Sequence, residues 1–415
     1  MRILWLNAGL LLPLDKGGKL RTWHLMRHLA RRHEITYLSF VDPETSAADR
    51  EGMREVCAHL HVVPRRDPAK GSAAFYLDAA SHLVDPLPYA AAKYRSAEYR
   101  QRIEQLLATT PFDLIVCDFL VPAVNLPASL PCPAVLFTHN VEAEIWRRHS
   151  ERQSGVLRRQ LFRQQWRRML RFEAATIGRF DCVLAVSDTD GDTLKRLYAS
   201  TLRSPVVTVA TGVDTDFFSP EQAAATDWRR SRPQDLVFTG SMDWIPNEDA
   251  MTHFCSDILP RIQAEEPDVT VTIVGRSPTP AVQRLARISG VEVTGRVDDV
   301  REYIGRAALY IVPIRIGGGT RLKIFEAMGM AKAIVSTAVG AEGLPVTDGR
   351  DIVIADDPDA FARAVIALLR DPARRMRLEQ NARDLVVANY DWSAVAGQLE
   401  EALVATAAKR AEAAA

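Results

Sequence analysis

The sequence contains little cysteine, and what it has is scattered. Five cysteines occur among 415 residues, and no two form a Cys-x-x-Cys pair: Cys57, Cys117, Cys132, Cys182 and Cys255. Disulfide-rich secreted domains and structural zinc sites need paired or closely spaced cysteines. The spacing therefore argues against a disulfide framework and a zinc site, and it favours a reducing cytoplasm.

An excess of charge of either sign is also absent. Lys and Arg total 52, and Asp and Glu total 52, so the net charge does not favour nucleic acid or an anionic surface as an obligate partner. No apolar run approaches the roughly 18 to 20 residues that a membrane span needs. The apolar start, Met1–Leu14, resembles a short signal peptide but has no small-residue cleavage site. We interpret Arg2–Leu6 as a buried first strand.

Short apolar runs alternate with longer amphipathic stretches, which predicts parallel strands joined by helices. A first series of strands is expected at Ile3–Asn7, Ile35–Phe40, His61–Pro64, Leu114–Cys117, Ala134–Thr138, Cys182–Val186 and Val206–Val209. A second series is expected at Leu236–Thr239, Val269–Val274, Val291–Thr294, Leu309–Pro313, Ala333–Ser336 and Ile352–Ile354. Intervening helices include Leu20–Arg31, Ser96–Leu107, Asn247–Ile262 and Leu322–Met330.

These series predict an α/β protein with two doubly wound, Rossmann-like domains facing a central cleft. The N-terminal domain is expected over residues 1–210 and the C-terminal domain over 236–388. A polar, turn-rich stretch, 211–235, is interpreted as the linker. A C-terminal helix is expected over 389–415, and its return to the N-terminal domain is an open option.

One run, Gly317–Met328, concentrates features of an anion site. Three glycines allow a tight turn and a close approach of the backbone, and the helix that follows presents free N–H groups and a positive dipole end. Arg321 can bind phosphate oxygens with a planar fork, and Lys323 adds a point charge. Glu326, one turn further, suits ribose hydroxyls. The run predicts a grip for a nucleoside diphosphate, and its alternative is a strand-to-helix turn with solvated cations.

Several segments together resemble the retaining glycosyltransferases of the GT-B fold, in particular family 4. The segments that carry the resemblance span nearly the whole chain: Met1–Leu6 with Gly17-Gly18, Thr138–Glu142, Ala185–Ser187, Thr211–Asp214, Phe238–Met242, Gly295–Val297, Gly317–Met330 and Ser336–Leu344. Each is weak alone, but their order and spacing are specific.

The resemblance implies that the C-terminal domain binds a nucleoside diphosphate sugar and the N-terminal domain binds the acceptor. It implies transfer without a metal or another cofactor, with Arg321 and Lys323 stabilising the departing diphosphate. His139 matches the family histidine beside the donor sugar, although a histidine at a strand end can also be a capping or core residue. Further donor-binding positions that the resemblance implies are Gly17, Gly18, Gly240, Ser241, Arg296, Gly317, Gly318, Gly319 and Thr320.

Two departures from the family pattern concern the donor. Many relatives have two glutamates separated by seven residues, whereas this chain has Gly318 at the first position and keeps only Glu326. Relatives also often place Arg and Lys after the first strand of the C-terminal domain, where this chain has Gly240–Asn247. Arg321 and Lys323 are then expected to supply that charge.

Two Asp-x-Asp patterns and one basic stretch have competing interpretations. Asp188–Asp190 and Asp214–Asp216 resemble metal-binding pairs of other glycosyltransferases, but their positions suit a helix cap and a turn, so we expect no metal site. Residues 147–171 contain nine arginines and one glutamate. This stretch is either a packed helix with solvated arginines or an amphipathic helix that contacts an anionic membrane.

We therefore expect a cytoplasmic hexosyltransferase, peripheral to the inner face of a membrane if residues 147–171 touch lipid, that acts in surface polysaccharide or glycoconjugate biosynthesis. Its expected partners are a nucleotide sugar and a glycan, lipid-linked or small-molecule acceptor, with no nucleic acid. An epimerase of the nucleotide sugar and a non-catalytic sugar-binding protein are the alternatives. A dinucleotide-dependent oxidoreductase is disfavoured because no Gly-x-Gly-x-x-Gly follows a predicted strand with an acidic residue about 20 positions later.

Overall fold

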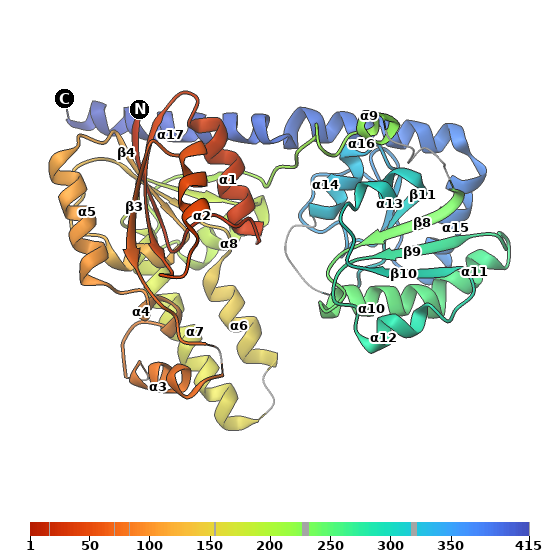
Figure 1. The fold of residues 1–415 in the computed structure, drawn as a ribbon, viewed down its shortest axis with the longest axis horizontal. Helices are drawn as coiled ribbons and strands as arrows, with labels where there is room; N and C mark the ends of the chain where they lie inside the picture. The colour runs from red at the N-terminus through yellow and green to blue at the C-terminus, as the bar shows by residue number, and fades with distance from the viewer. Residues whose placement is uncertain are drawn as a thin grey trace. The chain divides into compact units, whose positions relative to one another are not determined.

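The chain folds into two compact α/β units (Figure 1). The computed structural model describes residues 1–15, 17–69, 71–82, 84–152, 155–225, 232–316 and 322–414. The first unit comprises Met1–Ala210 together with Val395–Ala415, and the second comprises Thr211–Ala394.

The first unit contains a parallel sheet with the strand order β3-β2-β1-β4-β5-β6-β7. Its strands are β1 (Arg2–Asn7), β2 (Glu34–Val41), β3 (His59–Pro64), β4 (Leu114–Asp118), β5 (Ala134–Phe137), β6 (Cys182–Ala185) and β7 (Val206–Thr208). Every residue of β4, β5 and β6 is buried. Burial on both faces explains why the central strands are continuous apolar runs without an alternating pattern.

Helices connect these strands. They are α1 (Gly17–Leu29), α2 (Ala47–Gly52), α3 (Ala73–Ser81), α4 (Tyr89–Ala92), α5 (Ala97–Thr109), α6 (Glu142–Arg152), α7 (Val156–Ile177) and α8 (Asp188–Leu197), with short 3₁₀ turns at Met53–Glu55 and Val121–Asn125. Several begin at a serine whose hydroxyl accepts a backbone N–H of the first turn, as Ser96 does for α5 and Ser187 for α8.

The second unit repeats the design with the strand order β10-β9-β8-β11-β12-β13, again parallel throughout. Its strands are β8 (Arg232–Thr239), β9 (Thr270–Val274), β10 (Val291–Gly295), β11 (Ala307–Val312), β12 (Ile334–Ser336) and β13 (Val353–Ile354). Its helices are α9 (Pro220–Ala225), α10 (Ile245–His253), α11 (Leu259–Gln263), α12 (Pro280–Leu285), α13 (Arg301–Arg306), α14 (Leu322–Gly329), α15 (Pro358–Arg370), α16 (Pro372–Tyr390) and α17 (Trp392–Ala414), whose residues from Val395 onward belong to the first unit.

The predicted fold class, α/β with two doubly wound units, is confirmed, and each predicted strand is present. Two local predictions were wrong. The stretch 211–235 is not a simple linker, because it contains α9, the start of β8 and a bridge between Val213 and Asp391. The predicted helix Asn247–Ile262 is interrupted by a π-helical turn, Phe254–Ile258, just before Pro260, whose ring cannot continue a regular helix.

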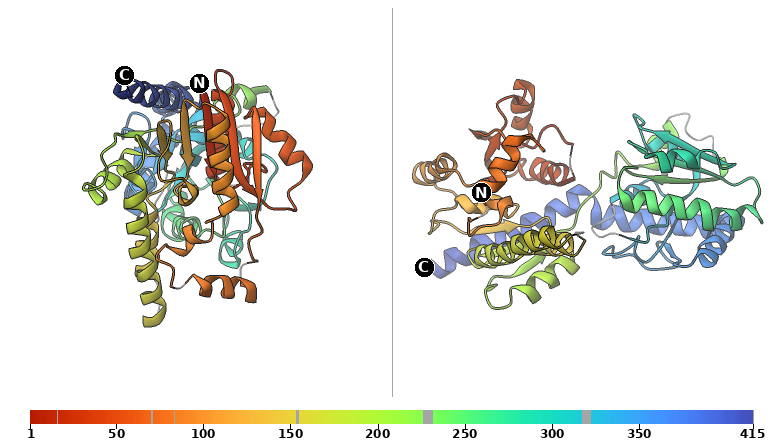
Figure 2. Two further views of the ribbon diagram at one scale, coloured as in Figure 1. Left: turned by 90° about the vertical axis from the view of Figure 1, so that its left-hand side faces the viewer. Right: turned by 90° about the horizontal axis from the view of Figure 1, so that it is seen from below.

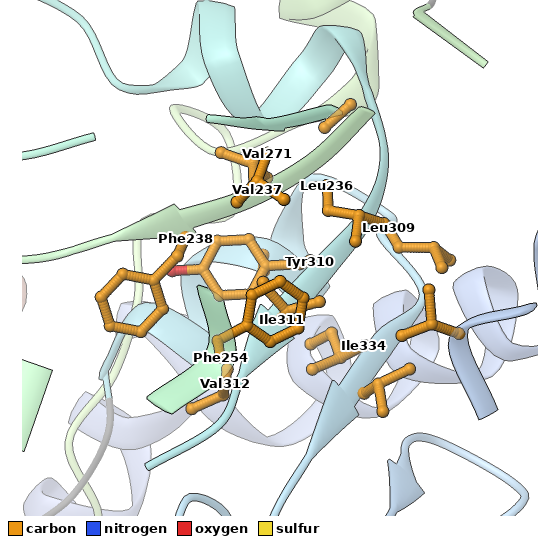
Figure 3. Close-up of a cluster of buried hydrophobic side chains, with 14 of the residues drawn as sticks. Leu236, Val237, Phe238, Phe254, Val271, Leu309, Tyr310, Ile311, Val312 and Ile334 are labelled. Carbon is orange, nitrogen blue, oxygen red and sulfur yellow. The ribbon is translucent and has the colours of Figure 1, made fainter. Parts of the chain in front are cut away.

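The core of the second unit lies between its sheet and the covering helices. Figure 3 shows apolar side chains of β8, β9, β11 and β12 meeting Phe254. Tyr310 is the polar exception in this cluster, and burial raises the pKa of its hydroxyl. Its oxygen lies 2.6 Å from the Thr239 Oγ1, which joins β11 to β8 at the centre of the sheet. The pairing satisfies two buried hydroxyls that would otherwise cost stability.

The helices α6 and α7 pack against one another and extend beyond the sheet of the first unit (Figures 1 and 2). Trp166 and Leu170 of α7 pack against the core, and Phe162 contacts Trp146 of α6 with ring centroids 5.9 Å apart. Leu161 stays exposed. The apolar side chains described in residues 147–171 therefore serve largely as a packing surface. No described helix is long and apolar enough to cross a membrane.

A buried carboxylate fixes where α6 begins. Glu173 of α7 accepts hydrogen bonds from the backbone N–H groups of Glu142 (3.0 Å) and Ala143 (2.9 Å), and from the hydroxyl of Tyr198 (2.6 Å). It thus serves as a distant N-cap for α6. The Glu142 side chain lies close to this group, and burial, with the charge of Glu173, raises the pKa of Glu142 to about 7.

We expect Glu142→Gln to stabilise the protein increasingly as pH rises above about 4.5. Because the folded-state pKa of Glu142 exceeds its ordinary value of 4.5, the folded state loses stability as pH rises from about 4.5 to 7. At pH 8 the variant should gain about 1 to 3 kcal/mol in the free energy of unfolding, and near pH 4.5 it should match the wild type. Thermal melting across this pH range checks the prediction.

Glu144→Gln is the matched control with the opposite sign. A hydrogen bond from Arg147 lowers the pKa of Glu144, so its contribution is present at neutral pH and is lost as pH falls. Glu144→Gln should therefore destabilise the protein at pH 8. A Glu142→Gln variant that is destabilised to the same extent would contradict the account.

Candidate functional site

Each sheet has one point where the order of the strands reverses. It lies between β1 and β4 in the first unit and between β8 and β11 in the second. Loops that leave the carboxyl ends of these strands run to opposite faces of the sheet, and doubly wound folds bind their ligands beside this point. Most of the predicted site residues that the structure describes follow these strands or their neighbours.

In the first unit, Asp118 ends β4 and is fully buried. Its Oδ2 accepts hydrogen bonds from Trp5 Nε1 (3.1 Å), Asn7 Nδ2 (2.7 Å) and Thr22 Oγ1 (2.7 Å), and its Oδ1 accepts one from His139 Nε2 (2.7 Å). The four donors come from β1, α1 and the segment after β5. A single carboxylate therefore joins three elements at the switch point, with both of its oxygens accepting hydrogen bonds.

This arrangement determines the state of His139. Because Asp118 offers only acceptors, the His139 Nε2 is the protonated nitrogen. Burial lowers the pKa of His139, while the charge of Asp118 acts in the opposite direction. The remaining nitrogen, Nδ1, lies 3.6 Å from the position of a Cβ placed on Gly18. The neutral imidazole thus offers a hydrogen-bond acceptor toward the first turn of α1.

Phe119 holds the imidazole plane. Its backbone adopts a left-handed conformation (φ 69°), which is costly for a residue other than glycine. Its ring stacks on His139 with centroids 3.8 Å apart and planes 9° apart. A Cβ on Gly18 would lie only 2.7 Å from the Phe119 Cζ, so position 18 has no room for a side chain. A Cβ on Gly17 would meet nothing within 4 Å.

A buried cation, Arg21, lies near the Asp118 carboxylate. Arg21 of α1 stacks on the ring of Phe137 (4.3 Å from its Cζ to the centroid) and donates a hydrogen bond to the carbonyl of Val209. Burial lowers its pKa to about 9, while Asp118 and Asp190 act to raise it. Asp118 therefore stands between an arginine and a neutral histidine.

In the second unit, Lys323 lies over the carboxyl end of β8. Its Nζ donates to Asn247 Oδ1 at 3.0 Å and lies 4.0 Å from the centroid of the Phe238 ring. A Cβ on Gly240 would lie 2.7 Å from the same Nζ and from the Asn247 Nδ2. The loop after β8 has no Arg or Lys of its own, and α14 brings a lysine to it from after β11.

Asn247 joins the parts of this arrangement. Its Nδ2 donates to the carbonyl of Ser241 at 2.8 Å, while its Oδ1 accepts from Lys323. The side chain is buried. One amide therefore fixes both the conformation of the loop after β8 and the position of the ammonium group.

Glu326 follows Lys323 by nearly one turn of α14. Burial raises its pKa, while the charge of Lys323 acts to lower it. Among the described residues, no hydrogen-bond donor reaches its carboxylate.

Two further arginines follow neighbouring strands. Arg276, after β9, donates from Nε to the Ser241 Oγ at 2.8 Å, and Arg296, after β10, is exposed. With Lys323 they place positive charge along the carboxyl ends of β8, β9 and β10. Gly317, Gly318, Gly319, Thr320 and Arg321 lie outside the described residues.

The Asp-x-Asp pairs have structural partners. Asp190 and Ser187 form a reciprocal cap at the start of α8, and Asp188 accepts from Thr208 Oγ1 at 2.6 Å. Asp214 accepts from the backbone N–H of Phe217 at 2.8 Å in a turn. Among the described parts of the chain, no group of three or more His, Cys, Asp or Glu side chains is gathered as a metal site would require.

Asp118, Asn247, Arg276 and Arg21 were not predicted from the sequence. Asp118 had a usable signal, because it is a carboxylate that directly ends an apolar strand at a switch point. The Asn247 contact had none, because it joins residues that lie 76 positions apart in the chain.

Comparison with known proteins identifies the family to which this chain is similar. Residues 16–217 match the model of Glycosyltransferase Family 4, and residues 233–371 match that of Glycosyl transferases group 1. The phosphatidyl-myo-inositol mannosyltransferase of Mycobacterium tuberculosis is 30% identical over 52% of this chain and 57% of its own length. The lipopolysaccharide core biosynthesis mannosyltransferase LpcC of Rhizobium leguminosarum is 26% identical over 59% of this chain and 74% of its own. The chain thus spans little more than half of the first of these relatives.

Among solved structures, the Anabaena protein HepE in complex with UDP and glucose superposes with a TM-score of 0.62 at 15% identity, covering 97% of this chain and 99% of that one. Two doubly wound units with this likeness define a protein of the GT-B fold. The two matched models, which together cover most of the sequence, show that the chain belongs to glycosyltransferase family 4.

We expect Asp118→Asn to destabilise the first unit by about 3 kcal/mol, because an amide cannot accept from all four donors and would direct its own N–H groups at one of them. Guanidinium unfolding followed by circular dichroism measures this. Asp113→Asn is the control, since Asp113 accepts from the exposed backbone N–H of Arg2 at 2.7 Å and should cost less than about 1 kcal/mol. Equal losses in the two variants would contradict the role of Asp118.

Proposed function

We propose that this protein transfers a sugar from a nucleoside diphosphate sugar to an acceptor hydroxyl, with retention of the anomeric configuration. The observation that carries the proposal is the Lys323 ammonium held over the carboxyl end of β8 by Asn247 and Phe238. A fixed cation at a switch point suits a phosphate group, because its position requires no reorganisation when charge develops there.

The relatives support the transferase part of the proposal. Two of them carry the names of mannosyltransferases, and the HepE structure holds UDP and glucose. None of these names is that of an epimerase, so the epimerase alternative is not favoured.

We assign the donor to the second unit. Lys323 and Arg276 would meet the negative charge of the diphosphate, joined by Arg321 and the glycines of 317–319 as their residue types favour. Glu326, whose carboxylate accepts no hydrogen bond from the described residues, would accept hydrogen bonds from ribose hydroxyls. In this proposal the cations of the protein neutralise the leaving group without a divalent metal.

In the first unit, the neutral imidazole of His139 would accept a hydrogen bond from a sugar hydroxyl through Nδ1. Asp118 fixes the tautomer that makes this possible, and Phe119 fixes the plane of the ring. A positively charged imidazole would lose this acceptor, which is consistent with the lowered pKa of His139.

The proposed chemistry is a front-face substitution. The bond between the anomeric carbon and the β-phosphate oxygen breaks, and the acceptor oxygen forms its new bond on the same face. The proton of the acceptor hydroxyl passes to the departing phosphate. The cations stabilise the charge on that phosphate, and this stabilisation is the contribution of the enzyme to the barrier.

The relatives whose names refer to lipid and lipopolysaccharide products favour an acceptor in surface glycan or glycoconjugate biosynthesis. A cytoplasmic location fits the five cysteines, which are all free and buried.

Release of nucleoside diphosphate with and without an acceptor tests the function. The purified protein is incubated with UDP-, GDP-, ADP- and dTDP-sugars and candidate acceptors, and products are separated by chromatography with anomeric assignment by NMR. We expect acceptor-dependent release from one donor, and a loss of about 100-fold or more in kcat for the double variant Arg321→Ala/Lys323→Ala. The control Arg284→Ala/Arg287→Ala removes two exposed charges of the same unit.

Near-normal transfer by the Arg321→Ala/Lys323→Ala variant would refute the assigned role of these cations. Conversion of the donor without any acceptor would indicate an epimerase, and an inverted product would contradict retention.

A further inference from the structure

An exposed apolar surface lies on the α3 helix of the first unit. The inner side of α3 contacts Tyr89. The Tyr89 ring meets Phe75 edge-on (6.3 Å between centroids), and its hydroxyl donates a hydrogen bond to Asp78 at 2.7 Å. The outer side carries Ala73, Ala74, Tyr76, Leu77, Ala80 and Ser81, all exposed. Tyr76 is 63% and Leu77 72% exposed. This polarity is the reverse of an ordinary surface helix, whose outward face is polar.

The neighbouring helix α7 adds positive charge. Arg163, Arg167 and Arg171 follow one another at intervals of four residues, so they share one side of the helix, and all three are exposed. Among the described residues, no carboxylate lies within ion-pair distance of any of them. Glu173, the sole acid of α7, is buried and committed to capping α6.

The two features lie on neighbouring elements: Arg163, Arg167 and Arg171 run along the part of α7 that Gln165 and Arg168 link to residues 82–89. Figures 1 and 2 show α3 and the N-terminal end of α7 extending beyond the sheet in the same direction. They are linked by hydrogen bonds, because Gln165 accepts from the backbone N–H of Tyr89 (2.8 Å) and Arg168 Nη1 donates to the carbonyl of His82 (3.4 Å). Val156, the first residue of α7, is 87% exposed at this end.

We propose that this end of the first unit is a docking surface for an anionic lipid bilayer. The surface, called here the α3–α7 surface, consists of Tyr76, Leu77, Val84, Val156, Arg163, Arg167 and Arg171. The exposed apolar side chains gain free energy when they enter the interfacial region of a bilayer, and the arginines gain it beside lipid phosphates. Within the described chain, these apolar side chains stay exposed to solvent, and the three arginines have no carboxylate within ion-pair distance.

A bilayer fits this surface better than a nucleic acid does. Nucleic acids reward cations and stacked aromatic rings, whereas exposed Leu77, Val84 and Val156 gain nothing beside a phosphate backbone. A bilayer rewards both parts of the surface at once. The inference does not depend on the donor chemistry, because none of these residues belongs to the candidate site.

Flotation with lipid vesicles tests the proposal. The full chain is mixed with phosphatidylcholine vesicles and with phosphatidylcholine–phosphatidylglycerol vesicles, without nucleotide, and the bound fraction is measured at low and high salt. We expect binding to the anionic vesicles that weakens as salt screens the charges. The charge variant Arg163→Gln/Arg167→Gln/Arg171→Gln should bind about 100-fold more weakly. The apolar variant Tyr76→Ser/Leu77→Ser should bind roughly tenfold more weakly.

Matched controls come from the second unit. Arg284→Gln/Arg287→Gln/Arg377→Gln removes the same charge from exposed positions, and Met376→Ser removes an exposed apolar side chain. Both should bind like the wild type, and all variants should keep the wild-type melting temperature.

Several outcomes would overturn the proposal. These are the absence of binding to anionic vesicles, equal weakening by the control variants, and RNA or DNA binding that depends on Arg163, Arg167 and Arg171 in place of vesicle binding. A dimer in sedimentation that Tyr76→Ser/Leu77→Ser dissociates, without vesicle binding, would assign the surface to self-association. None of these results would bear on sugar transfer, because the assay contains no donor.

Discussion

A charge removed from water must be solvated by the protein, and this constraint shapes both units of the chain. In the first unit the charge is the carboxylate of Asp118, which four donors from three elements surround. In the second it is the ammonium of Lys323, which rests on an aromatic face and an amide oxygen. Both stand where the strand order reverses. The elements around each switch point are thereby fixed before any ligand arrives, which is the condition for electrostatic preorganisation.

The second unit shows how one function can be met by a different part of the fold. The loop after β8 has no cation, and the glycine at position 240 leaves space that the Lys323 ammonium occupies from α14. Asn247 then ties loop and lysine together. A positive charge is thus delivered to the end of β8 by an element that follows β11. This exchange reconciles the departure from the family pattern in residues 240–247 with the proposed role of the site.

The fold could be predicted from the sequence further than the site could. Parallel strands buried on both faces are continuous apolar runs, so the strands from β1 to β13 had a local signal. His139, Lys323 and Glu326 also had one, through the resemblance to family 4. The contacts that give these residues their properties are nonlocal: Asp118 lies 21 residues from His139, and Asn247 lies 76 from Lys323. The left-handed backbone of Phe119 likewise follows from tertiary packing and had no signal in residue type. The apolar composition of α3 can be seen in the sequence, but which of its side chains stay exposed depends on tertiary packing.

The most direct test of the account is calorimetric titration of the protein with UDP, GDP, ADP and dTDP in the absence of divalent metal, with free sugars in parallel. The account predicts that one nucleoside diphosphate binds, that Lys323→Met weakens this affinity by about 100-fold and Asn247→Ala by about tenfold, and that the exposed-lysine control Lys195→Met leaves it unchanged. Binding of free sugar with no response to any nucleoside diphosphate, or undiminished affinity in Lys323→Met, would contradict it.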